Sequence, residues 1–375
     1  MLVIVADLFQ SKLRKLAQMK ASLSNRERLL TVFRGEKADR VPLTVYEWIY
    51  RWASEGLPLA ERPYSSLLTL IDTRGVSTES ARGVTLDRTE RIESGRRQVL
   101  TRVSTPLGEL TERVEFDVSF ESRWVRDHLI KSVDDYPIMK YICDHTELEP
   151  APEDFLEADA AMGERGIVVG GLPPTPLVWL ATEVMGTETW CTGLMQHPDE
   201  FDELHESVTR LYRRRLEIAA ESPAEVIWFA DSLTGAMVSP DLFNRYCKDS
   251  YDYGCRMFRQ AGKRTFAHFD GANGPIKDCI AQTGIDVIEA FTPPPMGQMS
   301  VAEARAAWPD KVVSVNFPGN LFVQPDAEIA EYTRQYLEEG GREGKLVIGC
   351  TEEFPRDQFD RVFSVIARTM NEYEG

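Results

Sequence analysis

The chain has 375 residues, 43% of them hydrophobic, and carries 60 acidic against 43 basic side chains. This length and apolar fraction are enough for a large core and exclude a disordered chain. The formal net charge of −17 repels polyphosphates, which makes nucleic acid a poor candidate partner. We therefore expect one large domain over residues 24–375, preceded by an N-terminal extension over residues 1–23.

The cysteines and the apolar segments indicate a cytoplasmic protein. The spacing of the six cysteines includes no CxxC pair and does not suggest a disulfide framework, so reduced thiols are expected. The apolar opening MLVIVADLF has no basic n-region and no small-residue cleavage site after it, which argues against a signal peptide. No run approaches the ~20 apolar residues of a membrane span.

The first half of the chain predicts a capped helix, two strands and a β-hairpin. Ser24 followed by Glu27 is a capping box that opens a helix ending at Gly35. Strands are expected at residues 40–46 and near residues 67–72. Two β-rich runs between residues 98 and 116 flank Pro106–Leu107–Gly108, which predicts a hairpin inserted into the main fold.

From the middle onward, short apolar runs alternate with longer amphipathic stretches. The expected strands are 167–171, 226–231, 265–269, 287–291, 312–317 and 346–350, and the helical stretches between them include 199–218, 240–261 and 300–307. This alternation implies a parallel sheet with right-handed crossovers and about eight strands in all. A doubly wound open sheet fits the same alternation, but no glycine-rich phosphate loop follows any strand. We therefore predict an α/β protein with a (β/α)8 TIM barrel, an N-terminal helical extension and an inserted β-hairpin.

Chemically capable side chains follow several of these strands, and in a barrel such strand ends converge on one mouth. The residues are Tyr46, Glu47, Trp48, Asp231, His268, Phe269, Asp270, Glu289 and Cys350. We expect Asp231 or Tyr46 to supply a proton or to orient a substrate. Glu47, Trp48, Trp228 and Phe269 are expected to contact the substrate or the edge of a corrin ring.

The same strand ends predict a metal site. His268 and Asp270 are two residues apart, so their side chains point to the same side of an extended strand. With Cys350 and Glu289 they form a set of nitrogen, sulfur and oxygen ligands that suits zinc better than magnesium or calcium. Whether Asp270 or Glu289 is the ligand stays open. Purely structural roles are also open, namely a core histidine, an inert buried cysteine, and acids that cap helices or turns.

Five short motifs resemble the uroporphyrinogen decarboxylase superfamily and occur in the order expected for it. They are Asn25–Leu30, Gly35–Pro42, Gln196–Phe201, Ser239–Phe243 and Thr283–Asp286, and the resemblance runs from Ser24 to the C-terminus. It implies a (β/α)8 barrel. True decarboxylases of the superfamily carry paired arginines after the first strand, whereas Val45–Trp52 holds one arginine and an acid, so the charges argue against decarboxylation of an anionic tetrapyrrole.

A second branch of the superfamily comprises corrinoid-dependent methyltransferases, and the inserted hairpin also resembles that branch. Its thiol-methylating members carry an HxC pair and a later glycine–cysteine pair. His268 and Gly349–Cys350 match this pattern, but Asp270 stands where the first cysteine is expected. A carboxylate in place of a thiolate makes a zinc ion harder and more Lewis acidic toward oxygen.

The resemblance thus implies a zinc-dependent methyltransferase that moves a methyl group between a small methylated substrate and a corrinoid carried by a separate protein. An O-demethylase acting on a methyl ether suits the oxygen-rich site. Barrels of this superfamily commonly form homodimers, and the oligomeric state stays open. Two alternatives stay open. One is a metal-independent decarboxylase centred on Asp231, and the other is a corrinoid- or tetrapyrrole-binding protein without turnover.

Overall fold

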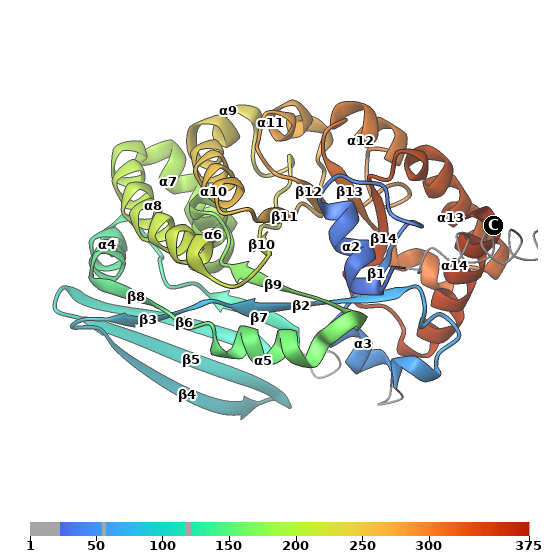
Figure 1. Cartoon of the computed structure of the whole chain (residues 1–375). Coiled ribbons are helices and arrows are strands. Elements are labelled where there is room, and N and C mark those ends of the chain that lie inside the picture. Colours follow the sequence, from blue (N-terminus) through green and yellow to red (C-terminus); the bar gives the residue numbers. More distant parts are fainter. Residues whose placement is uncertain (1–22, 55–57, 117–121, 375) are drawn as a thin grey trace, which may run out of the picture.

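The computed structural model describes residues 23–54, 58–116 and 122–374, and its centre is a closed barrel of eight parallel strands (Figure 1). The barrel strands are β1 (Leu43–Tyr46), β2 (Leu68–Gly75), β9 (Gly166–Leu172), β10 (Val226–Phe229), β11 (Arg264–His268), β12 (Val287–Phe291), β13 (Val312–Asn316) and β14 (Leu346–Cys350). Each pairs with its neighbour in this order, and β14 closes the ring on β1. The predicted (β/α)8 barrel is therefore confirmed. The predicted extension, except for Leu23, lies outside the described residues.

The barrel strands are buried on both faces, which is why they appear in the sequence as continuous apolar runs rather than as alternating ones. Every residue of β12, β13 and β14 is buried. Helices cover the outside of the barrel. Those described are α2 (Asn25–Phe33), α3 (Glu47–Ala53), α4 (Tyr136–His145), α5 (Glu153–Met162), α6 (Pro176–Trp179), α7 (Gly186–Gln196), α8 (Pro198–Glu221), α9 (Pro240–Leu242), α10 (Lys248–Gln260), α11 (Lys277–Ala281), α12 (Val301–Ala307), α13 (Asp326–Gly340) and α14 (Phe359–Glu374).

Local capping chemistry determines where several helices begin. The Ser24 hydroxyl accepts the backbone N–H of Glu27 while the Glu27 carboxylate accepts that of Ser24, so the predicted capping box of α2 is present. Ser300 and Glu303 make the same box at α12. The helix expected over residues 240–261 is continuous in space but contains a π-helical turn at Phe243–Cys247, between α9 and α10.

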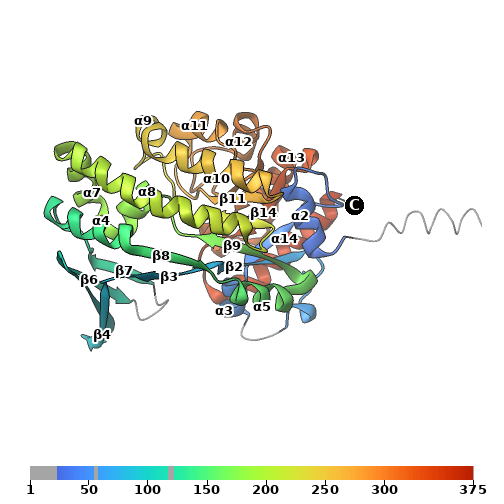
Figure 2. The same ribbon diagram turned by 60° about the vertical axis from the view of Figure 1, so that its left-hand side comes forward.

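The predicted hairpin exists and is part of a larger insertion between β2 and β9. Strands β5 (Arg96–Thr105) and β6 (Gly108–Phe116) pair antiparallel as expected. They lie between β4 (Thr85–Glu93) and β7 (Arg123–Asp127) in a four-stranded sheet, and β3 (Ser77–Ala81) pairs with β8 (Thr146–Pro150) beside it. This sheet stands outside the barrel, beyond α4 and α8 (Figures 1 and 2).

The insertion leaves the barrel at the C-terminal end of β2, so it is attached at the end of the barrel that carries active sites in this architecture. Among the described residues, no helix is both long and apolar enough to cross a lipid bilayer.

Candidate functional site

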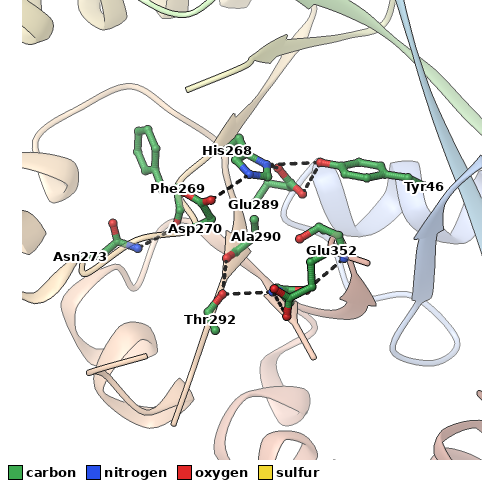
Figure 3. A network of polar contacts seen from close by, with 11 residues as sticks. Tyr46, His268, Phe269, Asp270, Asn273, Glu289, Ala290, Thr292 and Glu352 are labelled. Carbon is green, nitrogen blue, oxygen red and sulfur yellow. Dashed lines mark hydrogen bonds and ion pairs between the residues drawn. The ribbon is translucent and has the colours of Figure 1, made fainter. Parts of the chain in front are cut away.

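Three strands bring polar side chains together inside the mouth of the barrel. Tyr46 is the last residue of β1, His268 is the last residue of β11, and Glu289 lies in the middle of β12. His268 and Glu289 are register partners on adjacent strands, whereas β14 and β13 separate β1 from β12. Tyr46 therefore reaches across the barrel to meet the other two, as Figure 3 shows. We call Tyr46, His268, Asp270 and Glu289 the His268 cluster.

Glu289 is the centre of this cluster. Its Oε2 lies 2.6 Å from Nδ1 of His268, and its Oε1 accepts the Tyr46 hydroxyl at 2.7 Å. Both carboxylate oxygens are thus used, and Nδ1–H of the imidazole points to Glu289. The other ring nitrogen, Nε2, lies 3.6 Å from Oδ2 of Asp270, which is beyond normal hydrogen-bond distance. Nε2 is therefore the ring atom left to act on a ligand.

The two carboxylates hold the imidazole in its charged form. Burial by itself would lower the pKa of His268, but Glu289 and Asp270 outweigh it and raise that pKa to about 10. Burial, followed by the charge of Glu289, raises the pKa of the Tyr46 hydroxyl well above its usual value, so Tyr46 stays a neutral donor. At neutral pH the barrel mouth thus contains an imidazolium whose Nδ1 is hydrogen-bonded to Glu289 and whose Nε2 is paired with Asp270 at 3.6 Å, too far for a hydrogen bond.

A backbone irregularity in β12 accompanies the cluster. Ala290, directly after Glu289, has φ +56°, a left-handed conformation that is unfavourable for a residue with a Cβ. The pairing of β12 with β13 shifts register between Ile288 and Phe291, which is the signature of a bulge. Bulges re-aim side chains next to active sites, and strained residues concentrate there. Here the bulge separates Glu289 from Thr292, the next polar residue of the site.

A cavity of about 370 Å³ opens beside His268, at the small end of the ~300–1,000 Å³ range of ligand sites. We call it the mouth cavity, and its lining residues are His268, Asp270, Gly271, Ala272, Thr292, Met296, Gly297, Gln298, Asn316, Thr351 and Glu352. His268 and Asp270 are the only predicted site residues among them.

Sequence reasoning missed the other polar lining residues. Asn316 Nδ2 donates to Thr292 Oγ1 at 3.2 Å and to Glu352 Oε1 at 3.3 Å, and Asn316 Oδ1 accepts the backbone N–H of Thr351 at 3.0 Å. Asn316 is the last residue of β13, so the strand-end rule that selected His268 could have found it too. Thr292 and Glu352 follow their strands by one and two residues, as Glu47 and Trp48 follow β1, so the same rule could have selected them.

A match to a known family agrees with this architecture. The model of the family "Uroporphyrinogen decarboxylase (URO-D)" matches residues 173–351, which include β10 to β14 and every lining residue of the mouth cavity except Glu352. This part of the chain is thus similar to the uroporphyrinogen decarboxylase family.

One of the solved structures that match this chain shares its fold. A methyltransferase from Methanosarcina mazei is 14% identical with a TM-score of 0.59, covering 94% of this chain and all of its own. The GH20 catalytic modules of the pneumococcal exo-β-D-N-acetylglucosaminidase StrH match at 9% identity and a TM-score of only 0.39, covering 89% of this chain and 84% of theirs. No curated protein sequence matches this chain.

The zinc ligands expected from the URO-D resemblance are only partly together. Both carboxylate oxygens of Glu289 are hydrogen-bonded within the cluster. Of the predicted ligands, His268 Nε2 and Asp270 therefore remain beside the cavity, one fewer than the three protein ligands of a catalytic zinc. Cys350 is 1% exposed, does not line the cavity, and its thiol lies 3.5 Å from the backbone oxygen of Glu352.

Burial raises the pKa of Cys350, so without a metal the sulfur is a thiol, and only a bound metal ion would deprotonate it. Among the described residues, no group of three or more His, Cys, Asp or Glu side chains is arranged to hold a metal ion. This arrangement does not fit the predicted set of His268, Asp270, Glu289 and Cys350, and the zinc site stays a prediction from the sequence.

Asp231 lies in the core of the barrel and not in the mouth cavity. Its side chain is fully buried and accepts three hydrogen bonds, from the backbone N–H of Thr175 at 2.6 Å, the Thr175 hydroxyl at 3.0 Å and the Tyr251 hydroxyl at 2.6 Å. These contacts tie the segment after β9 to β10 and α10. The predicted proton-donating role for Asp231 therefore has no open path to a ligand here, whereas Tyr46 is in the cluster.

The residues predicted to contact substrate lie at different depths. Trp228 packs edge-on against both His268 and Tyr46, with ring centroids 6.0 and 6.3 Å apart, and its buried indole Nε1 has no hydrogen-bond partner among the described residues. Trp48 is exposed and stacks on Tyr46. Phe269, however, is fully buried against Tyr251 and away from the cavity.

The remaining residue of that predicted set, Glu47, pairs with Arg51 on α3 at 3.1 Å. It does not line the mouth cavity. Of the aromatic and acidic residues expected to hold a substrate, Trp228 is thus the one in direct contact with His268.

Proposed function

We propose that the protein is a methyltransferase that removes a methyl group from a small methyl ether and passes it to a corrinoid carried by a separate protein. The match of residues 173–351 to the URO-D family and the full-length similarity in fold to a protein named as a methyltransferase support this class of function. The observation that carries the proposal is the imidazolium of His268, with its Nε2 beside a cavity of small-molecule size.

The chain's own part in the reaction is to deliver a proton. The corrinoid, when bound, supplies the nucleophile that accepts the methyl group. As the methyl carbon–oxygen bond breaks, its electron pair stays on the oxygen, and His268 Nε2 gives its proton to that oxygen so that an alcohol or phenol leaves. Glu289 and Tyr46 orient the ring, and the resulting imidazole regains a proton from solvent.

A proton donor at this position favours an ether over an amine. A methylated ammonium releases a neutral amine and needs no proton, whereas an ether oxygen leaves as a poor, charged leaving group unless it is protonated. Proton transfer by a positioned side chain typically contributes ~10²–10⁴-fold to a rate. The cluster of Tyr46, Glu289 and Asp270 around His268 is suited to that task.

Decarboxylation of a polyanion is less well supported. The mouth cavity carries the acids Asp270 and Glu352 against the single cation His268, and Asp231 is closed off by its three donors. Zinc-dependent activation of the ether oxygen stays a prediction from the sequence, and the metal content of the purified protein tests it.

The experiment compares two leaving groups. Methyl transfer to free cob(I)alamin is measured with methoxybenzene, whose phenoxide leaves poorly, and with 4-nitromethoxybenzene, whose nitrophenoxide leaves without much protonation. We expect His268→Gln to lower the rate by about 10²-fold or more for the first substrate and by no more than about tenfold for the second. Tyr46→Phe, which keeps the imidazole and loses one bond to Glu289, is the matched control and should have a much smaller effect.

Equal losses with both substrates in His268→Gln would show that the histidine does not protonate the leaving group. Release of CO₂ from a carboxylated substrate, with no methyl transfer by the wild-type protein, would replace the proposal with the decarboxylase alternative.

A further inference from the structure

We infer that Glu352 recognises a second polar group of the substrate and selects a hydrogen-bond donor, a hydroxyl or an ammonium, over a carboxylate. This inference names the substrate class of the proposed demethylation and so rests on that function, although its geometric basis is separate from the His268 cluster. It starts from the position of Glu352, which lines the mouth cavity together with His268.

The Glu352 carboxylate is held in place from one side only. Its Oε1 accepts the backbone N–H of Gly319 at 2.7 Å and the amide of Asn316 at 3.3 Å (Figure 3). The hydrogen bonds of the described residues leave Oε2 without a donor. Because one oxygen is anchored, the other is a pre-positioned acceptor that a ligand can reach without ordering the side chain first.

Asn316 is itself oriented, which makes the subsite rigid. The backbone N–H of Thr351 donates to Asn316 Oδ1, so the Asn316 amide must present Nδ2 to Glu352 and to Thr292. The Thr292 hydroxyl in turn donates to the backbone oxygen of Ala290 at 3.1 Å. The left-handed Ala290 thus links this subsite to Glu289 and the proton-donating end of the cavity.

The charges of the residues that line the cavity also favour a hydrogen-bond donor over a carboxylate. Its ionisable lining residues are His268, Asp270 and Glu352, and no Lys or Arg lines it. Within the described part of the chain, the Glu352 carboxylate forms no ion pair. Sites that bind carboxylates typically use Arg or Lys. The unpaired negative charge of Glu352 in a partly enclosed site would instead repel an anionic ligand. A methyl ether with a hydroxyl or ammonium group fits, and one with a carboxylate does not.

The size of the cavity limits the ligand to about one ring. A volume of about 370 Å³ is enough for a single ring with two substituents, and it is far too small for a tetrapyrrole. Monocyclic methoxyphenols and methoxybenzoates of equal substitution are therefore suitable probes, since they differ only in the group that Glu352 would contact.

The test measures equilibrium binding by calorimetry, so that it does not depend on methyl transfer. The probes are the 2-, 3- and 4-isomers of methoxyphenol and methoxybenzoate, followed by their demethylated products. We expect the wild-type protein to bind at least one methoxyphenol at least tenfold more tightly than the matching methoxybenzoate. Glu352→Gln should reduce this preference to less than about threefold. Glu353→Gln makes the same charge change at an exposed neighbour that does not line the cavity and should keep the preference.

Equal binding of the two series, a preference for carboxylates, or a Glu352→Gln variant that keeps the wild-type preference would each overturn the inference. The two proposals fail separately. If the protein binds dihydroxybenzenes more tightly than hydroxybenzoates but transfers no methyl group, the Glu352 inference stands and the proposed methyltransferase function is wrong. If the protein transfers the methyl group but shows no such binding preference, the methyltransferase function stands and the Glu352 inference is wrong.

Discussion

The stability of this fold should depend on pH through one buried carboxyl, that of Asp231. Burial raises its pKa from the usual 3.8 to about 6, although the bonds from Tyr251 and Thr175 act in the other direction. Because the folded state holds this proton more tightly than the unfolded chain, the resulting stabilisation is complete below the unfolded pKa and is lost as the pH rises through about 6.

The size of the effect follows from the difference between the two pKa values. A shift of about two units corresponds to about 3 kcal/mol in total, of which about 2 kcal/mol is lost between pH 4.5 and 7.5. Asp231→Asn removes the titration while its side-chain oxygen can still accept from Thr175. The free energy of unfolding of the wild type minus that of Asp231→Asn should therefore fall by about 2 kcal/mol across that range.

The assay is urea unfolding of both proteins at half-unit steps of pH, with Asp357→Asn, which alters an exposed acid, as the control. The difference in free energy of unfolding between the wild type and Asp357→Asn should not show the fall with pH that is expected for Asp231→Asn. A difference between the wild type and Asp231→Asn that stays flat, or that rises with pH, would refute the reasoning. It would mean that the three donors outweigh burial and keep Asp231 ionised throughout.

The remaining predictions concern Trp228 and Cys350. Trp228→Phe removes an indole N–H that has no partner among the described residues and whose burial costs ~1–3 kcal/mol. Removing this cost should offset the packing lost with the larger ring, so the free energy of unfolding should change by less than about 1 kcal/mol. If the indole N–H donates to the substrate, kcat/KM for the ether should fall. An unchanged kcat/KM would exclude that contact. If Cys350 is an inert core thiol, Cys350→Ala should cost about 1 kcal/mol in urea unfolding and leave the metal content unchanged. Stoichiometric zinc in the wild type that is lost in Cys350→Ala and in His268→Ala would instead establish the ligand set predicted from the sequence.

The proposed site combines a rigid acid–base end with a separate recognition end. His268 is fixed by Glu289, and Glu352 is fixed by Gly319 and Asn316, so both functional groups are held before any ligand arrives. Preorganised groups of this kind reduce the entropy cost of binding and of reaction. The bulge at Ala290 joins the two ends through the backbone of β12.

The barrel could be predicted from residue patterns because the information that specifies its strands and helices is local. Strands such as β12 and β14 have the residue bounds predicted from their apolar runs, and the capping box at Ser24 starts α2 where Ser24 and Glu27 predict it. Buried parallel strands and capped helices are specified by residues close together in the chain, so periodicity and spacing suffice. The position of His268 at a strand end, and hence at the barrel mouth, follows from the same rule.

Which of the strand-end side chains meet depends on how distant strands pack together, and no sequence pattern reveals it. Tyr46 and Glu289 are separated by 243 positions and join across the barrel, while Cys350, also at a strand end, is buried away from the cavity. The direction of a side chain at a strand end depends on bulges and on neighbours from other strands, such as the left-handed Ala290, and no local pattern encodes these. For the same reason Glu352, which follows its strand by two residues, became part of the site only through its contacts with Gly319 and Asn316.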